Sequence, residues 1–470
     1  MRVVSFEGDT WCARVDEGDV RGDLLRIADA VGRLSRSSRL GASVYVGYDA
    51  RALSVDVARE FGDVIASHGV RTLVSGVHCP MAALCEAVRR DAHAFAGIML
   101  TGGNRSADYA GVRIRISDGS AASPSDTDAL ETLVPSDVPC ARGRSEEVDV
   151  VTPYLERTAA FLRGWGGEGR GPLVVCDVMH GALVGHASRL LGGMGARVVP
   201  LHDETDECLG GLHPDAAEPW VDDCEQAVRD NGADLGLAID GDGNRLALVD
   251  ERGSLVTPHV MLAILMEHLV RNYGITGRMV APIFVSTIVR RQAERLGMPL
   301  TVTPAGYQWM REEMATGDVV CAGDALGGVC VPVLGLERDA LGVAALLVEA
   351  VASDGRKLSE IVAALGDELG HMVYGQVEVR LTPAGIQVLR NALPGLNPSE
   401  IAGERPVSVS HPGGLMARFA DGSWLLLRPS RSRPAALLAA EAPAPPGRDR
   451  LLAAGRALAL APLGPRPLVV

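Results

Sequence analysis

Short apolar runs alternate with amphipathic stretches along most of the chain, and this alternation predicts its architecture. Apolar runs favour buried strands, whereas apolar residues at helical spacing favour helices that cover them. In the first segment, strands are expected at 43–49, 71–76, 94–100 and 111–116, and helices at about 54–68 and about 81–90. Strands and helices that alternate in this way form parallel α/β layers. We therefore expect an α/β domain at 1–147, ending in a low-hydrophobicity helix and linker.

The same alternation of strand and helix occurs twice more. The elements expected next are, in chain order, strands at 173–178, 197–201 and 235–240 with helices at about 182–193 and 221–231, then strands at 279–283, 300–304 and 319–324 between further helices. A unit that recurs along a chain predicts repetition of one architecture. Two more α/β domains are expected, at 148–252 and 253–370.

The C-terminal segment has a different pattern. Its expected elements are two helices and strands at 376–381, 417–419, 424–428 and 436–440. Consecutive strands with few helices predict a small α+β domain, here at 371–470. The expected fold class is therefore α/β, with three repeated domains on mixed sheets and a C-terminal α+β domain.

An acidic loop at 240–245, Asp-Gly-Asp-Gly-Asn-Arg, follows directly on the apolar strand that begins at Leu235. Its two glycines let the backbone fold sharply. The fold turns Asp240, Asp242 and Asn244 toward one point, and such oxygen ligands suit Mg²⁺ or Ca²⁺ better than zinc. The alternative is a solvated hairpin turn, because Asp-Gly pairs are common turn signals.

Two arginine positions suggest phosphate binding. Arg245 ends the acidic loop, where a guanidinium can hold a phosphate beside a bound ion. A second loop at 428–434, Arg-Pro-Ser-Arg-Ser-Arg-Pro, lies between two expected strands and combines guanidiniums with hydroxyls. The alternative for this loop is a solvated basic turn.

Composition excludes several classes of function. The formal net charge of −14 argues against a nucleic-acid or anionic-membrane surface, because phosphate backbones are bound through clustered positive charge. Any phosphate ligand must therefore be small and locally held. Apolar residues make up 47% of the chain, which is ample for several packed cores. Lys357 is the only lysine, so a lysine base or Schiff-base nucleophile is not available elsewhere.

Cysteine usage and hydropathy bear on the compartment. The nine cysteines show no C-x-x-C pair or zinc spacing, which favours buried thiols in a reducing cytoplasm. The N-terminal residues lack a charged-then-apolar signal pattern, and no run of 18 apolar residues occurs. We expect a cytoplasmic protein that is not exported. The oligomeric state is left open by the sequence.

Seven stretches match, in order, the loops of one known family. With the family pattern each one matches, they are 45–51 (V-G-Y-D-x-R), 97–111 (G-I-M-I-T-A-S-H-N-P-x-x-Y-N-G), 177–181 (D-P-M-H-G), 240–245 (D-G-D-x-D-R), 303–308 (T-P-x-G-F-K), 323–327 (G-E-x-S-G) and 428–434 (R-P-S-G-T-E-P). On these residues the chain resembles, nearly end to end, the α-D-phosphohexomutase superfamily of phosphoglucomutases and phosphomannomutases.

The resemblance implies a four-domain, heart-shaped protein with a central cleft. In the family, a phosphoserine of the first domain gives its phosphoryl group to a hexose 1- or 6-phosphate, and the phosphoryl returns from the other position of the bisphosphate. It also implies Mg²⁺ on the acidic loop. The third-domain loop, 323–328 here, would hold sugar hydroxyls, and the fourth-domain loop, 428–434, would grip the distal phosphate.

The chain departs from the family pattern around the nucleophile. The family's serine aligns with Gly103, in the loop 101–106, and glycine has no side chain to carry a phosphoryl group. The neighbouring histidine aligns with Asn104. The lysine proposed as general acid/base aligns with Arg113, whose pKa is too high for proton transfer at neutral pH.

Further departures affect the metal and the ligand. The third metal carboxylate is Asn244, so the loop should hold Mg²⁺ more weakly. The glutamate of the third loop is Asp324, and the fourth loop gains positive charge. The residues expected to bind a phosphorylated ligand are Arg245, Asp324, Arg428, Ser430, Arg431, Ser432 and Arg433.

Three interpretations remain open. The first is a diverged protein that binds a phosphorylated sugar or related phosphate and is not a standard 1,6-phosphomutase; if it is repurposed for other chemistry, Asp324, His180 or His213 would be its base. The second is an active mutase with a replacement nucleophile, Thr101 or Ser106. The third is a catalytically dead regulatory or scaffold protein.

Overall fold

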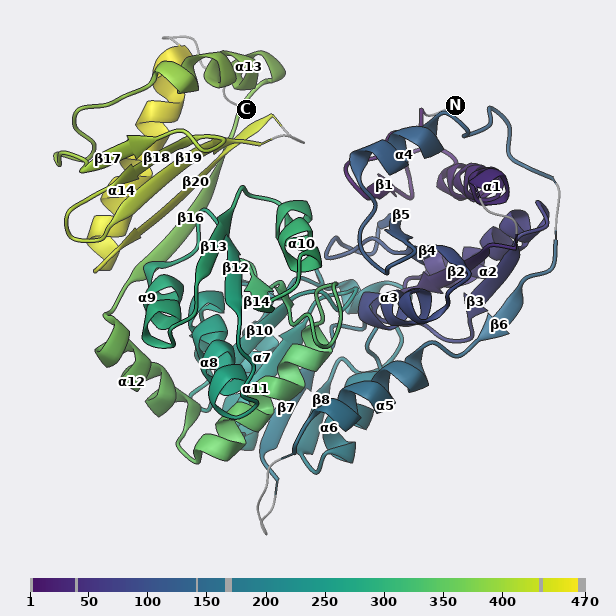
Figure 1. Cartoon of the computed structure of the whole chain (residues 1–470), viewed down its shortest axis with the longest axis horizontal. Coiled ribbons are helices and arrows are strands. Elements are labelled where there is room, and N and C mark those ends of the chain that lie inside the picture. The colour runs from purple at the N-terminus through teal and green to yellow at the C-terminus, as the bar shows by residue number, and fades with distance from the viewer. Residues whose placement is uncertain (1–2, 39–40, 141–142, 165–170, 431–433, 464–470) are drawn as a thin grey trace. The chain divides into compact units, whose positions relative to one another are not determined.

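The computed structural model describes residues 3–38, 41–140, 143–164, 171–430 and 434–463 (Figure 1). The chain forms two compact units. The first unit comprises residues 1–278 and 311–361, and the second comprises 279–310 and 362–470. The four domains expected from the sequence are a finer division, and their boundaries remain a prediction.

The first sheet of the first unit has six strands in the order β1-β5-β4-β2-β3-β6. They are β1 (Thr10–Arg14), β2 (Ser43–Tyr48), β3 (Arg71–Ser75), β4 (Ala94–Leu100), β5 (Tyr109–Ile116) and β6 (Glu146–Val148). β2 is parallel to β3 and β4, which confirms the parallel layer at the centre. β5 is antiparallel to β4 and β1, so the sheet is mixed.

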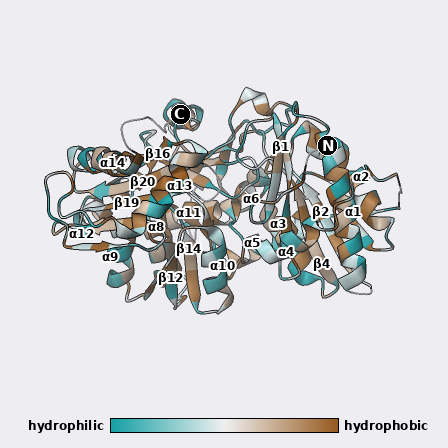
Figure 2. Ribbon diagram, turned by 90° about the horizontal axis from the view of Figure 1, so that it is seen from above, coloured by the Kyte–Doolittle hydropathy of each residue, from teal (hydrophilic) through white to brown (hydrophobic). Residues whose placement is uncertain are grey.

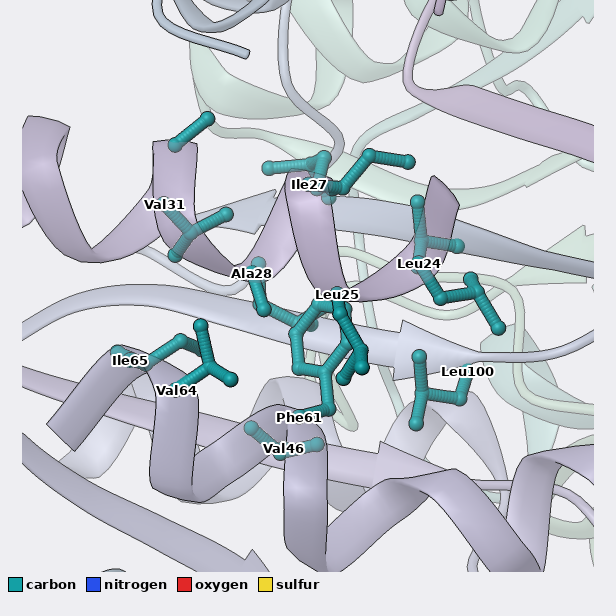
Figure 3. Packing of buried hydrophobic residues seen from close by; sticks show 14 of the residues in the cluster. Leu24, Leu25, Ile27, Ala28, Val31, Val46, Phe61, Val64, Ile65 and Leu100 are labelled. Carbon is teal, nitrogen blue, oxygen red and sulfur yellow. The ribbon is translucent and has the colours of Figure 1, made fainter. Parts of the chain in front are cut away.

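Three helices cover this sheet: α1 (Val20–Ser38), α2 (Ala52–Ala66) and α3 (Met81–Arg90). α1 packs on α2 and β5, and α2 packs on β2 and β3; Figure 3 shows Leu25 and Ala28 of α1 near Phe61 of α2. These side chains are almost fully buried. In Figure 2 the helices of the first unit carry both hydrophobic and hydrophilic residues, as expected for helices with one buried face.

The second sheet of the first unit has five strands in the order β11-β10-β9-β7-β8. They are β7 (Leu173–Asp177), β8 (Arg197–Leu201), β9 (Leu235–Ile239), β10 (Leu246–Asp250) and β11 (Leu255–Val256), and the helices beside them are α5 (Val151–Phe161), α6 (His186–Gly193) and α7 (Asp222–Asn231). β9 is parallel to β7 and antiparallel to β10. The expected strand, acidic loop and strand at 235–250 are therefore confirmed.

The expected start of one helix was wrong. The sequence predicts a helix from about 182, whereas α6 begins at His186. Met179 and His180 adopt positive φ angles of 50° and 51°, and Gly185 precedes the helix at φ 72°. Left-handed residues interrupt helical hydrogen bonding, so the chain turns here before the helix can begin.

The remaining elements of the α/β part follow in chain order. They are α8 (Pro258–Arg271), β12 (Arg278–Pro282), α9 (Thr287–Arg295), β13 (Leu300–Thr303), α10 (Tyr307–Ala315), β14 (Val319–Gly323), β15 (Val329–Cys330), α11 (Ala340–Asp354) and α12 (Leu358–Leu369). β12 and β13 are parallel, whereas β14 and β15 form an antiparallel pair. α11 packs on β9 and β10, and its first twelve residues, 340–351, are all buried. It therefore covers the strands that carry the acidic loop.

The C-terminal part of the second unit is an antiparallel sheet in the order β16-β20-β19-β18-β17. Its elements are β16 (Val373–Arg380), α13 (Pro383–Ala392), β17 (Ser408–Ser410), β18 (Leu415–Arg418), β19 (Trp424–Pro429), β20 (Ala435–Ala442) and α14 (Pro445–Leu460). α14 packs on β16, β19 and β20. The four expected strands and two helices are confirmed, and β17 is an additional short edge strand.

Glu441 of β20 is a fully buried carboxylate in the second unit. It accepts hydrogen bonds from the Ser286 hydroxyl, the Thr287 N–H at 2.8 Å and the Trp424 indole N–H at 2.8 Å. A buried carboxylate with three donors is well satisfied. Its contacts join β20 to β19 and to the start of α9.

We expect Glu441→Gln to lower the free energy of unfolding by about 1–3 kcal/mol, because the amide nitrogen faces donors and the charge-assisted bonds are lost. Urea unfolding followed by tryptophan fluorescence measures the loss. The matched control is Glu378→Gln on the exposed face of β16, which should change stability by less than about 0.5 kcal/mol. Equal stability of the two variants would contradict this account.

Candidate functional site

Three of the four predicted loops lie together in the first unit. A Cβ atom built on Gly103 would lie 3.8 Å from Asp242 Oδ2, so the loop 101–106 faces the acidic loop. The acidic loop also contacts the loop 323–328, because the Leu246 N–H donates to the Gly327 carbonyl at 3.1 Å. Arg245 and Gly328 form a β-bridge beside this bond. The fourth predicted loop belongs to the second unit and is described separately below.

The side chain of Asp240, the first residue of the acidic loop, holds the loop in its turn. Asp240 Oδ1 accepts the backbone N–H groups of Asn244, at 2.7 Å, and Arg245, at 2.9 Å. Gly243 has φ 76°, a conformation that favours glycine at this turn. Burial and the neighbouring Asp242 carboxylate both raise the pKa of Asp240. A buried pair of carboxylates is stabilised by a cation.

The side chains of Asp242 and Asn244 suit such a cation. Both are almost completely buried. Neither oxygen of Asp242, and neither amide atom of Asn244, has a hydrogen-bond partner among the described residues. Buried oxygens without donors are the ligands that a divalent ion requires, so Asp240, Asp242 and Asn244 fit Mg²⁺. One other cation already lies next to them.

That cation is the guanidinium of Arg113, on β5. Its Nη1 atom lies 3.0 Å from Asp242 Oδ2, an ion-pair distance, although the angle is not that of a hydrogen bond. A Cβ atom on Gly103 would lie 2.7 Å from Arg113 Nη2. The guanidinium therefore occupies the space between the loop 101–106 and the acidic loop.

A buried aspartate and arginine hold the loop 101–106 in place. Asp49 accepts hydrogen bonds from the Arg51 guanidinium and from the Thr101 hydroxyl, the latter at 2.7 Å. Arg51 also donates to the backbone carbonyls of Gly103, at 3.0 Å, and Arg105. Both residues lie in the segment that resembles V-G-Y-D-x-R, yet the sequence assigned them no role. Their function in the structure is to set the backbone of this loop.

The other predicted residues of this loop have clear places. Thr101 is 1% exposed, and its hydroxyl donates to Asp49 and accepts the Gly103 N–H at 2.9 Å. The Ser106 hydroxyl donates to the Asp108 carboxylate. Asn104 is half-buried in the turn between them. Both hydroxyls are thus engaged in contacts within the loop and its flanks.

The side chains of Arg245 and Asp324 both make polar contacts with neighbouring residues. Arg245 Nη1 lies 3.0 Å from Asp215 Oδ1, a contact that sequence reasoning missed. Asp324 Oδ1 accepts the N–H groups of Leu326 and Gly328, at 2.8 Å and 3.1 Å, and so shapes its own loop. The side chain of Arg338 passes beside it, because a Cβ on Gly328 would meet both Asp324 and Arg338. Arg338 is a further cation here that the sequence did not indicate.

The two candidate histidines have structural contacts. His180 is 6% exposed, and its Nδ1 lies 2.8 Å from the Glu204 carbonyl oxygen. The His213 ring stacks on Trp220 with 4.9 Å between centroids. These contacts fix the two turns that follow β7 and β8.

The fourth loop is described only in part. The Ser430 N–H donates to the Ala435 carbonyl at 2.8 Å, which continues the pairing of β19 with β20. Arg390 of α13 donates to the Ser430 carbonyl at 2.6 Å. Arg428 lies at the end of β19, and Arg431, Ser432 and Arg433 lie outside the described residues. The phosphate-binding role of this loop remains a prediction.

Comparison with known families decides the relationship. Three profiles of the phosphoglucomutase/phosphomannomutase family match the chain: α/β/α domain I at residues 11–138, domain II at 154–253 and domain III at 257–368. The chain belongs to the α-D-phosphohexomutase superfamily. The resemblance and the fold class expected from the sequence are thereby confirmed.

Individual superfamily members are similar at moderate identity. The phosphomannomutase/phosphoglucomutase of Pseudomonas putida is 26% identical over 353 residues, covering 74% of this chain and 72% of that protein. The phosphoglucosamine mutase of Rhodospirillum rubrum is 27% identical over 447 residues, covering 92% and 91%. These relatives carry three different substrate names, so the match gives the superfamily and leaves the substrate open.

Solved structures agree with the fold. A Thermus thermophilus protein described as a phosphomannomutase superposes with a TM-score of 0.84 at 27% identity, covering 97% of this chain and 99% of that one. The Aspergillus fumigatus N-acetylphosphoglucosamine mutase, solved with GlcNAc-6P and magnesium, has a TM-score of 0.61 at 12% identity, covering 96% and 93%. Among the described residues, none of the helices combines the length and hydropathy of a membrane-spanning segment.

Proposed function

We propose that this superfamily member binds a phosphorylated sugar at the site formed by the loops 101–106, 240–245 and 323–328, and that it is not a standard 1,6-phosphomutase. The main support for this proposal is the presence of glycine at residue 103. It lies opposite Asp242, at the position aligned with the family's nucleophilic serine. Glycine has no hydroxyl, so no phosphoryl-enzyme can form there.

The polar groups around this position support a ligand with negative charge. Arg113 contacts Asp242, Arg245 belongs to the acidic loop and Arg338 lies beside Asp324. Guanidiniums bind phosphate through paired N–H groups. The Asp324 carboxylate would accept hydrogen bonds from sugar hydroxyls. In the second unit, Arg428 and Ser430, with Arg431, Ser432 and Arg433, would form a phosphate-binding loop. Each of these roles is part of the proposal.

We include Mg²⁺ in the proposal, on Asp240, Asp242 and Asn244, as a weakened site. When bound, the ion would polarise a phosphate oxygen of the ligand. Asn244 supplies an amide oxygen in place of a carboxylate, so the loop attracts the ion with one negative charge less.

A second candidate is an active mutase with a replacement nucleophile, and the names of the relatives favour it. Thr101 and Ser106 are the hydroxyls available in the loop. Either one would have to break its contact, with Asp49 or Asp108, before it faced the acidic loop. In-line phosphoryl transfer depends on such positioning, so we place this candidate second. A scaffold protein without turnover is the third.

A coupled mutase assay with glucose 1-phosphate and mannose 1-phosphate, in the presence of Mg²⁺ and the bisphosphate activator, tests the proposal. The native protein should show no turnover above the uncatalysed background. Turnover would instead establish a replacement nucleophile. Isothermal titration with the same sugar phosphates tests binding separately, and Arg245→Ala should weaken it at least about tenfold, since one charge-assisted phosphate contact contributes about 1.5–3 kcal/mol.

Gly103→Ser is the informative variant in this assay. Serine at φ 65° costs about 1–2 kcal/mol, and its Cβ would displace Arg113 Nη2, which is the end of a flexible side chain. The variant should therefore fold, and it should gain mutase activity if the site still binds a hexose phosphate. Silence from the variant, together with absence of binding by the native protein, would point to a different ligand.

A further inference from the structure

An ion pair joins the acidic loop to β5. Arg113 Nη1 lies 3.0 Å from Asp242 Oδ2, and the Asp242 side chain is 1% exposed. Arg113 itself is mostly buried, with 18% of its side chain exposed. An arginine stays protonated at every pH at which the protein folds, so this contact brings a permanent positive charge to the carboxylate.

Gly103 makes this position of the guanidinium possible. A side chain at residue 103 would begin 2.7 Å from Arg113 Nη2, which is closer than atoms can approach without displacement. The guanidinium therefore occupies space that a side chain at residue 103 would need. A serine at residue 103 would require the guanidinium to move from this position.

The charges around the loop show what Arg113 replaces. The loop carries the carboxylates of Asp240 and Asp242 and the neutral amide of Asn244. Arg245 is engaged by Asp215 at 3.0 Å. Within the described part of the chain, Arg113 is a cation in direct contact with Asp242. It neutralises the carboxylate that a divalent ion would otherwise neutralise.

The position of Arg113 has a second electrostatic consequence, at Asp9 just before β1. Burial acts to raise the pKa of Asp9, but the guanidiniums of Arg115, Arg113 and Arg338 together lower it. Asp9 precedes Thr10, which pairs with Arg113 across β1 and β5. The positive charge of Arg113 thus acts on carboxylates on two sides of the site.

We propose that the Arg113 guanidinium is the resident cation of the acidic loop: it takes the place of a divalent ion at Asp242 and makes the binding of a sugar phosphate independent of added metal. This inference rests on the proposed function, because it assumes that a phosphate binds beside the loop. It adds that the native protein binds Mg²⁺ or Mn²⁺ poorly because the guanidinium competes for Asp242.

Metal binding is tested directly with Mn²⁺, whose free concentration is followed by electron paramagnetic resonance. The native protein should bind Mn²⁺ weakly, and Arg113→Gln should bind it at least about tenfold more tightly, because removal of the guanidinium leaves Asp242 unneutralised. Adding Asp242→Asn to this variant should abolish the gain. The matched control is Arg14→Gln on the neighbouring strand β1, which removes the same charge from an exposed pair with Asp16 and should leave Mn²⁺ binding unchanged.

Ligand binding is tested by titrating the native protein with mannose 1-phosphate, in EDTA and in Mg²⁺. The two dissociation constants should agree within about twofold, whereas Arg113→Gln should bind only with Mg²⁺. A native protein that requires Mg²⁺, or that binds Mn²⁺ as tightly as Arg113→Gln, would overturn the inference. If no sugar phosphate binds under either condition, the proposed function fails, and the Mn²⁺ titrations still decide whether Arg113 excludes the metal.

Discussion

Arg115→Met is expected to lower the free energy of unfolding by about 3–5 kcal/mol. Arg115, on β5, is completely buried and lies between two carboxylates of the first unit. It contacts Asp9 through Nη1 and Glu337 through Nη2, the latter at 2.9 Å. Methionine fills similar space but leaves the buried Glu337 carboxylate with one cation fewer, since Arg338 stays at 3.2 Å, and a buried carboxylate that loses a charge partner is costly.

Urea unfolding of the full chain, followed by circular dichroism, measures the loss. The matched control is Arg71→Met on β3, whose pair with Glu146 is exposed on both sides, and it should cost about 0–1 kcal/mol. Combining Arg115→Met with Glu337→Gln should recover part of the loss, because the carboxylate that lost this cation is then neutral as well. If Arg115→Met is no less stable than Arg71→Met, the buried network does not contribute as described.

Arg51→Met should also destabilise the first unit, by about 3 kcal/mol, and should loosen the loop 101–106. The guanidinium is 2% exposed and joins Asp49 to the carbonyls of Gly103 and Arg105. Its removal takes the side-chain donor from the buried Gly103 carbonyl and the partly buried Arg105 carbonyl, and the charge partner from Asp49. Arg51→Lys should recover little, because an ammonium cannot reproduce the planar set of N–H groups that serves three acceptors.

Hydrogen exchange separates the two effects of this change. Amides of 101–106 should exchange faster in Arg51→Met than expected from the global loss of stability, because the loop loses its anchor. Arg59→Met, which removes an exposed pair with Glu147 on the same unit, serves as the control. Unchanged protection of the loop in Arg51→Met would show that other contacts fix its backbone.

Much of the fold was predictable because its central strands have apolar, buried centres. β2, β3 and β4 were expected within one residue of their ends, since nearly all of their residues are buried and each contains a short apolar run. α1 was not assigned, although its apolar residues recur at helical spacing. β6 has only three residues, too few for a pattern to indicate it.

The sequence predicts which loops form the candidate site, but it predicts few of the contacts that their side chains make. The acidic loop follows from local sequence, because its glycines and the flanking strands are adjacent. The contact of Arg113 with Asp242 does not, since it joins residues far apart in the chain whose side chains meet only after both sheets have formed. For the same reason the pairs of Arg245 with Asp215 and of Arg51 with the loop backbone left no signal in the sequence.

The hydrogen bond from Leu246 to the Gly327 carbonyl has a consequence for how the protein is made. The acidic loop is complete as a local turn once residue 245 has been synthesised. The loop 323–328, which pairs with it, has not yet been synthesised at that point. A nascent chain must extend past residue 328 before the two segments can pair. The site is thus among the later features to be assembled during synthesis, after the strands that support it.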